Sequence, residues 1–209
     1  FAKALNCPRA ADRTGDRETW ARPCDECPAC TAIHTGQDID VIEMDGASNR
    51  GIEDIRSIVE SIGRPATRGA YKVYLIDEVH MLTREAFNAL LKTIEEPPPY
   101  ILWIFATTDR HKVPATILSR CQQLEFRPLA AERIADHLRT IADAESFDLA
   151  PSAAGAIARA ARGSVRDALS LLDQLRAFSS GHVDDAAVSA VLGVPQLDAL
   201  VDLVRALAT

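Results

Sequence analysis

The sequence contains no long hydrophobic run. Its longest nearly apolar stretches are Val73–Ile76 and Ile101–Ala106, far short of the ~20 residues that cross a bilayer. We therefore expect no membrane span. The first residues, Phe1–Asn6, include Lys3 and are followed by no apolar core, so we also expect no secretory leader.

Positive charge is also in deficit. The 209 residues include 23 Lys and Arg against 30 Asp and Glu, a formal charge of −7. Bulk electrostatic attraction to nucleic acid is therefore excluded, and contact with DNA would need a local basic patch or partner proteins. Hydrophobic residues make up 47% of the chain, which excludes disorder for most of it and predicts one or two globular domains.

Cysteine is scarce except at the start of the chain, where four residues follow a C-x16-C-x2-C-x2-C pattern. They are Cys7, Cys24, Cys27 and Cys30. Two-residue spacers let thiolates from one tight turn converge on an ion, and a distant fourth thiolate closes a tetrahedral shell. The pattern predicts a structural Zn2+ site with these four ligands.

The same cysteines allow three alternatives to this zinc site. Disulfides are disfavoured in a chain without a secretory signal. Each C-x2-C pair also matches a redox motif, although a redox pair needs only two thiols. His34 could replace one cysteine as a ligand.

The stretch from Pro8 to Pro23 is expected to be a solvated surface loop.

The pattern over the first 128 residues predicts parallel β–α–β units. Three segments have the character of strands, and the two segments between them have apolar residues at helical spacing, with connections too long for hairpins. The predicted strands and helices, in order, are Asp38–Asp45, Ile52–Gly63, Tyr71–Ile76, a helix capped by Thr83 and stopped by Pro97, and Ile101–Ala106. This order predicts a parallel sheet with right-handed crossovers.

After Pro128 the chain is rich in Ala and Leu and shows no convincing strand. The helices predicted there are Ala131–Ala144, Ser152–Ala161, Val165–Phe178, Val183–Leu192 and Gln196–Ala208. The expected domains are therefore residues 1–128 with a zinc module at 7–30, a helical domain at 129–193, and the start of a further helical region at 194–209.

Two acids, Asp77 and Glu78, follow the apolar run that ends at Ile76. The carboxyl end of a parallel strand projects polar residues into the ligand crevice. Asp77 would hold Mg2+, directly or through water, and Glu78 would orient and polarise an attacking water, as in P-loop ATPases. The alternative is a strand followed by an acidic turn.

Polar residues after the next strand strengthen this interpretation. If the strands are neighbours, Thr107 is expected beside Glu78, with Thr108 as a close rival. Arg120, beyond a short helix that follows Pro114, could stabilise charge on a transferring phosphoryl group. Arg166, in the first turn of a helix capped by Ser164, would favour an anionic partner. The alternative for either arginine is a solvated surface charge.

The motifs at 71–82, 87–98, 106–109, 117–121 and 163–170 stand in one order after the four-cysteine module. Together they closely resemble the gamma/tau subunits of bacterial DNA polymerase III, the ATPases of the replicative clamp loader. The resemblance implies a RecA-like AAA+ α/β domain with a zinc-binding insertion, followed by a small all-α lid. It implies ATP, Mg2+ and Zn2+ as cofactors. It also implies a cytoplasmic, replisome-associated protein that works with other clamp-loader subunits in a hetero-pentamer, a sliding clamp and primed DNA.

The resemblance also suggests a role for each motif residue. Asp77 and Glu78 match the Walker B pair, and Thr107 matches sensor 1. Arg120 matches the finger that completes a neighbouring subunit's ATP site, and Arg166 matches the sensor 2 arginine. Basic residues that could touch DNA, including Arg50, Arg64 and Arg68, could equally be solvated charges.

Two departures from the family accompany the resemblance. No G-x-x-x-x-G-K-[ST] phosphate loop occurs in the sequence, so we expect residues 1–209 alone to bind ATP poorly and not to turn over. The family's collar domain is also missing, so we expect a monomer. Two competing functions remain: a scaffold subunit that does not hydrolyse ATP, like the delta-prime subunit of the clamp loader, and a free-standing zinc or dithiol interaction module.

Overall fold

The computed structural model describes residues 1–10, 22–179, 181–193 and 206. The chain divides into two compact units, Phe1–Gln123 and Leu124–Thr209. The predicted domain boundary at residue 128 lies five residues beyond this division. Within the described residues, no helix is both long enough and apolar enough to cross a bilayer.

A three-stranded parallel sheet forms the centre of the first unit. Its strands are β1 (Val41–Asp45), β2 (Lys72–Asp77) and β3 (Ile101–Phe105), in the order β1-β2-β3. β2 is the central strand, and its apolar side chains are almost wholly buried because it has a neighbour on each side. The predicted parallel sheet is confirmed.

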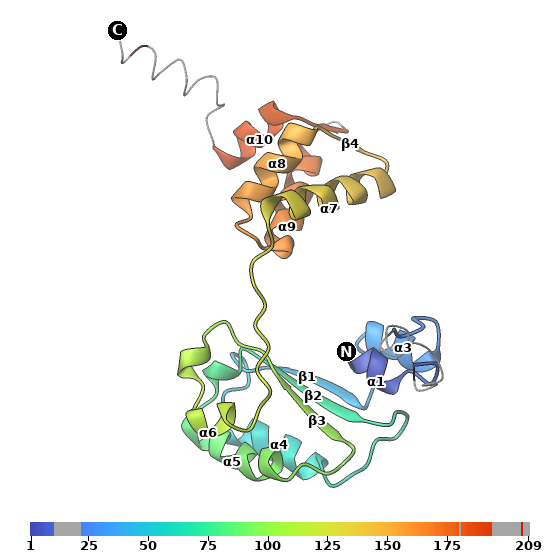
Figure 1. Ribbon diagram of the computed structural model, residues 1–209, viewed down its shortest axis with the longest axis vertical. Helices are drawn as coiled ribbons and strands as arrows, with labels where there is room; N and C mark the ends of the chain where they lie inside the picture. Colours follow the sequence, from blue (N-terminus) through green and yellow to red (C-terminus); the bar gives the residue numbers. More distant parts are fainter. Residues whose placement is uncertain (11–21, 180, 194–205, 207–209) are drawn as a thin grey trace. The chain divides into compact units, whose positions relative to one another are not determined.

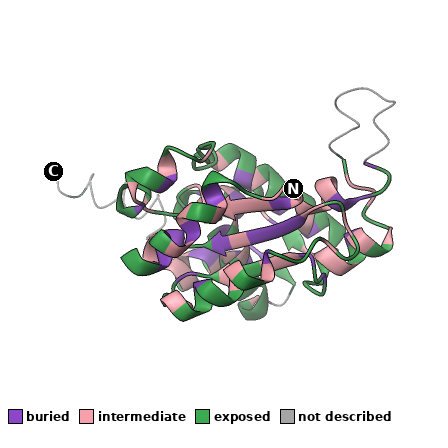
Figure 2. Cartoon of the chain, turned by 90° about the horizontal axis from the view of Figure 1, so that it is seen from below, coloured by how far each residue is buried: buried purple, intermediate pink, exposed green. Residues whose placement is uncertain are grey.

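The helices α4 (Ile52–Ser61) and α5 (Arg84–Glu95) pack against this sheet (Figure 1). Ile55 of α4 and Phe87 and Leu90 of α5 share one buried cluster with Ile76 of β2. α5 begins where predicted, because the Thr83 hydroxyl accepts a hydrogen bond from the backbone N–H of Ala86. Burial is concentrated on the strands and on the helix faces turned toward them (Figure 2). The short elements of this unit are η1 (Val79–Met81), η2 (Arg110–Lys112) and α6 (Ala115–Leu118).

Two short helices, α1 (Ala2–Asn6) and α3 (Pro28–His34), carry the cysteine cluster. The side chain of Asn6 joins this module to the segment that enters β2. Its Nδ2 donates to the Tyr71 carbonyl, and its Oδ1 accepts from the Tyr71 backbone N–H, both at 2.9 Å. This paired contact fixes the position of the module relative to the sheet.

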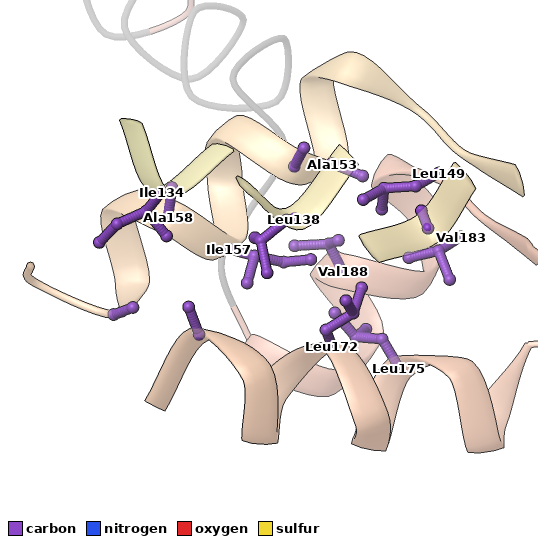
Figure 3. Close-up of a cluster of buried hydrophobic side chains, with 14 residues drawn as sticks. Ile134, Leu138, Leu149, Ala153, Ile157, Ala158, Leu172, Leu175, Val183 and Val188 are labelled. Atoms are coloured by element: carbon purple, nitrogen blue, oxygen red, sulfur yellow. The ribbon is translucent and has the colours of Figure 1, made fainter. Parts of the chain in front are cut away.

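The second unit is helical. It contains α7 (Ala131–Ala144), α8 (Pro151–Ala160), α9 (Val165–Phe178) and α10 (Asp185–Leu192). Leu138, Ile157 and Leu172, from three different helices, meet in its core (Figure 3). Gly163 precedes α9 with φ of +90°, and a Cβ there would lie 2.5 Å from the Cβ of Pro128.

One pair of strands in the second unit differs from the prediction, and one predicted helix is not tested. The structure pairs β4 (Asp148–Leu149) with β5 (His182–Val183) in parallel, where no strand was expected. Two-residue strands are too short to produce a recognisable alternation of apolar and polar residues. The predicted helix Gln196–Ala208 lies almost entirely outside the described residues.

Candidate functional site

The carboxyl end of β2 carries the two predicted acids. Asp45, the last residue of β1, lies opposite Asp77 in the parallel register. The Asp77 side chain is exposed, and its Oδ1 accepts the backbone N–H of Glu78 at 2.9 Å. Oδ2 has no hydrogen-bond partner among the described residues. Asp77 therefore has a carboxylate oxygen available to a hard cation such as Mg2+.

Glu78 adopts a left-handed backbone conformation, with φ and ψ both 45°. This region costs a non-glycine residue about 1–2 kcal/mol, and such residues concentrate at functional sites. The turn is held in place from both sides: the Val79 N–H donates to the Ala106 carbonyl, and the Met81 N–H donates to the Glu78 carbonyl, both at 2.9 Å. The left-handed turn directs the chain from β2 into η1.

Thr108, and not Thr107, contacts the Glu78 carboxylate. The Thr108 hydroxyl donates to Glu78 Oε2 at 2.9 Å, and the Thr108 backbone N–H donates to the same oxygen at 3.2 Å. Of the two threonines expected beside Glu78, the rival Thr108 makes the direct contact, and Thr107 is linked to Glu78 through His80. Ala106 remains bonded to β2, and the loop that begins at Thr107 turns the second threonine toward the carboxylate.

Thr107 contacts His80, a residue for which no role was predicted. His80 Nδ1 lies 2.9 Å from Thr107 Oγ1 and 3.1 Å from Glu78 Oε2. The His80 side chain is 9% exposed and that of Glu78 is 32% exposed. The available signal was positional: His80 stands two residues after Glu78 in a tight turn, a spacing that allows its ring to fold back over the carboxylate.

Arg120 lies two residues beyond the short helix α6, as expected from Pro114. Its Nη2 is 2.5 Å from Glu95 Oε1, and its Nη1 donates to the Thr116 carbonyl at 2.7 Å. The Arg120 side chain is 36% exposed and that of Glu95 is 45% exposed. Exposed ion pairs stabilise a fold by only about 0–1 kcal/mol, so the guanidinium can leave Glu95 for another anion at little cost.

The other predicted arginines lie on the surface. Arg166 is exposed at the second position of α9, whose N-cap Ser164 accepts the Asp167 N–H as expected. Arg50 donates through Nε to the Met81 carbonyl at 3.1 Å. Arg64 and Arg68 are exposed. Exposure alone does not show whether any of these four arginines binds a nucleotide or DNA.

The four predicted cysteines converge. The sulfur atoms of Cys7, Cys24, Cys27 and Cys30 all lie within 4.8 Å of one another, and no other metal-binding group occurs within the described part of the chain. Ligands about 2.3 Å from a tetrahedral Zn2+ lie a little under 4 Å apart, so the cluster fits the ion closely. His34 is not a member of the cluster.

Backbone N–H groups already point at the sulfur atoms. The N–H groups of Cys24, Cys27 and Cys30 donate to the sulfur of the preceding cysteine, at 3.3–3.4 Å. Such bonds stabilise the thiolate form, which is the form that binds metal.

The cysteine pKa values diverge within this cluster. Burial raises the pKa of Cys7, but the N–H groups of Cys24 and Ala10 lower it by more, to about 6. Burial, and then the neighbouring Cys27 side chain, raise the pKa of Cys30 to about 12. A cation would stabilise all four thiolates together.

Comparisons with known proteins give consistent results. Residues 1–130 match a family model described as DNA polymerase III, delta subunit, and residues 133–181 match the ATPase lid domain of a DNA polymerase III clamp loader subunit. The chain is 47% identical to DNA polymerase III subunit tau of Escherichia coli, over 99% of this chain and 31% of that protein. It is also 47% identical to the tau subunit of Bacillus subtilis, over 89% of this chain and 32% of that protein.

A third relative, DNA polymerase III subunit gamma of Buchnera aphidicola, is 43% identical over 93% of this chain and 52% of that protein. The chain thus spans about a third to a half of the length of these relatives. Among solved structures, RuvB of Thermotoga maritima matches with a TM-score of 0.63 and 19% identity, over 80% of this chain and 57% of that chain. This likeness establishes the RecA-like AAA+ fold with its parallel sheet.

Proposed function

We propose that this chain, which belongs to the clamp-loader subunit family of DNA polymerase III, is part of an ATP-hydrolysing clamp-loader subunit. One observation supports this most directly. In a chain 43–47% identical to tau and gamma subunits, an acidic pair follows the central strand of a parallel sheet, and Thr108 from the loop after the next strand donates to the second acid. That arrangement suits hydrolysis of a phosphoanhydride.

Each residue at this sheet edge has a proposed role. Asp77 would hold Mg2+, which neutralises charge on the phosphates. Glu78 orients and polarises the attacking water. Thr107 and Thr108 both place a hydroxyl where a terminal phosphate could be sensed. Thr108 is the better candidate for direct contact with Glu78, because it already donates to that carboxylate.

The two arginines complete the site from different places. We assign Arg120 to the ATP site of a neighbouring subunit, because its guanidinium lies at the surface and its one ionic contact among the described residues is with the exposed carboxylate of Glu95. Arg166 is assigned to the nucleotide of its own subunit, because it projects from the first turn of α9 in the matched ATPase lid. In both roles the guanidinium stabilises charge on the phosphates.

The zinc site is structural in this proposal. Cys7, Cys24, Cys27 and Cys30 would occupy all four positions of a tetrahedral ion, which leaves no position for substrate. The ion would tie α1 to α3, and Asn6 would transmit that order to the entry of β2.

In this proposal, residues outside this sequence complete the ATP site and the subunit assembly. The phosphate-binding loop, which the sequence lacks, would grip the nucleotide, and further domains would hold the subunit among its partners. In the assembled loader, ATP binding would open a sliding clamp on primed DNA, and hydrolysis would release the clamp closed around the DNA.

One alternative function has an observation in its favour. The family model that matches residues 1–130 is described as the delta subunit, and a scaffold subunit would keep this fold without hydrolysing ATP. The acidic pair at residues 77–78 favours the ATPase, because a scaffold has no need of a water-orienting carboxylate.

Substitution of Glu78 tests the proposal. In the full-length protein assembled with its partners, Glu78→Gln should keep ATP binding and lower kcat by about 100-fold or more, because the water loses its activating carboxylate. Glu60→Gln, on an exposed position of α4, is the matched control and should leave kcat unchanged. Unchanged turnover in Glu78→Gln would support the scaffold.

A further inference from the structure

His80 is the most enclosed titratable side chain at this sheet edge, and its imidazole contacts the proposed water-activating residue. Nδ1 lies 3.1 Å from Glu78 Oε2 and 2.9 Å from Thr107 Oγ1. One nitrogen atom therefore touches the side chains that follow two adjacent strands, β2 and β3. A ring that served only to fill space would have no need of either polar contact.

The carboxylate determines which state of the ring is compatible with this geometry. An unprotonated Nδ1 would bring its lone pair within 3.1 Å of the carboxylate oxygen Oε2, which is repulsive. We infer that Nδ1 carries a proton, which it donates to Thr107 Oγ1 while the positive end of the N–H bond lies beside Glu78. The Glu78 carboxylate then accepts two donors from Thr108, its hydroxyl and its N–H, and lies 3.1 Å from the positively polarised Nδ1–H of His80.

The same assignment determines the direction of the Thr107 hydroxyl. Thr107 Oγ1 already accepts the Asp109 backbone N–H at 3.0 Å. With Nδ1–H as a second donor, both acceptor positions of the oxygen are occupied. The hydroxyl proton is left to point away from the protein contacts, where it can donate to an incoming anion such as a phosphate oxygen.

We propose that His80 is a positioning residue for ATP hydrolysis, which holds the Glu78 carboxylate in place and orients the Thr107 hydroxyl toward the phosphate. This inference rests on the proposed function and deepens it. The same N–H of His80 bonds Thr107 and lies beside Glu78, so a phosphate that engages Thr107 alters the position of the N–H next to the Glu78 carboxylate. His80 touches neither water nor nucleotide and acts through these two side chains.

The test compares two substitutions in the full-length, assembled protein. His80→Ala removes the donor and should lower kcat by about 10- to 100-fold, because small displacements of a reacting group cost that much. The Kd for ATP should change by no more than about twofold. His80→Asn can place an amide N–H near the position of Nδ1–H and should recover kcat to within about threefold of the wild type. His137→Ala, on the exposed face of α7, is the control for loss of a histidine.

A double substitution separates positioning from folding. In the Glu78→Gln background, His80→Ala should lower kcat by less than about threefold, because the group through which His80 acts is already gone. Wild-type kcat in His80→Ala, a loss that His80→Asn does not rescue, or a full additional loss in the Glu78→Gln background would each overturn the inference. The proposed function would fail differently: Glu78→Gln itself would then leave turnover unchanged.

Discussion

Asp40 should contribute several kilocalories per mole to the stability of the first unit, although it lies outside both candidate sites. Its carboxylate is 1% exposed and accepts the backbone N–H groups of Thr67, Arg68 and Gly69, at 2.6–3.1 Å. These donors belong to the loop that leads into β2. A single carboxylate thus anchors the segment whose far end carries the acidic pair Asp77 and Glu78.

The effect of Asp40→Asn follows from these contacts. A hydrogen bond to a charged group contributes about 1 kcal/mol more than a neutral one, so three weakened bonds cost about 3 kcal/mol. The new amide group would also face the Thr67 N–H, donor against donor. With a urea dependence of about 2 kcal/mol per molar, the midpoint should fall by about 1.5 M.

Tryptophan fluorescence in urea measures this loss directly. Both tryptophans of the sequence, Trp20 and Trp103, belong to the first unit, so the signal reports that unit. Asp38→Asn is the matched control: Asp38 is also buried, but within the described part of the chain its side chain accepts a single hydrogen bond, from the Asp40 N–H, which asparagine preserves. A loss below about 1 kcal/mol in Asp40→Asn, or one equal to the control, would refute the reasoning.

The pH dependence of the same loss provides an independent check. Burial raises the pKa of Asp40. The N–H groups of Arg68, Thr67 and Gly69, together with the charge of Lys72, lower the pKa by a larger amount, so it lies below its ordinary value of 3.8. A carboxyl group with a lowered folded-state pKa stabilises the fold above its unfolded pKa. The stability difference between wild type and Asp40→Asn should therefore be complete at neutral pH and shrink as pH falls below about 4.

Three further predictions concern the cysteine cluster, the surface arginine and the helical core. Purified protein should contain about one Zn2+ per chain. Cys7→Ser or Cys30→Ser should abolish Zn2+ binding, whereas Cys121→Ser should not. Metal analysis that finds no Zn2+ in the wild type would refute the assignment of a zinc site. Arg120→Ala should depress ATP hydrolysis at the adjacent subunit's site by about 10³-fold; a mixed-subunit assay in which only the mutated subunit's own site fails would refute the assignment in trans. Leu138→Ala, at a fully buried position of α7, should destabilise the second unit by about 2–5 kcal/mol in thermal unfolding followed by circular dichroism; a loss no larger than that of the exposed control Thr140→Ala would contradict the core packing.

The fold was largely accessible to sequence reasoning. The bounds of α7 and α9 agree with the prediction to the residue, because each helix has a strong apolar stripe and a sharp change of character at its ends. The parallel sheet was predictable because apolar runs alternate with amphipathic helices. The β4–β5 pair was missed because two residues per strand leave no period to detect.

The candidate site was only partly accessible. Convergence of the four cysteines follows from their spacing, and the acids follow from the end of an apolar strand. Whether Thr107 or Thr108 contacts Glu78 depends on the conformation of the turn after β3. A turn that began one residue earlier or later would direct the other hydroxyl at the carboxylate. The contact of His80 depends on the left-handed backbone at Glu78, which no propensity indicates.

Nucleotide binding tests the central claim most directly. ATP with Mg2+ should be titrated into the full-length protein and into residues 1–209 alone. The account predicts saturable binding by the full-length protein. It predicts weak or no binding by residues 1–209, because this sequence contains no phosphate-binding loop. Failure of the full-length protein to bind ATP would contradict the assignment as an ATPase subunit, and tight binding by residues 1–209 alone would contradict the proposed division of the site.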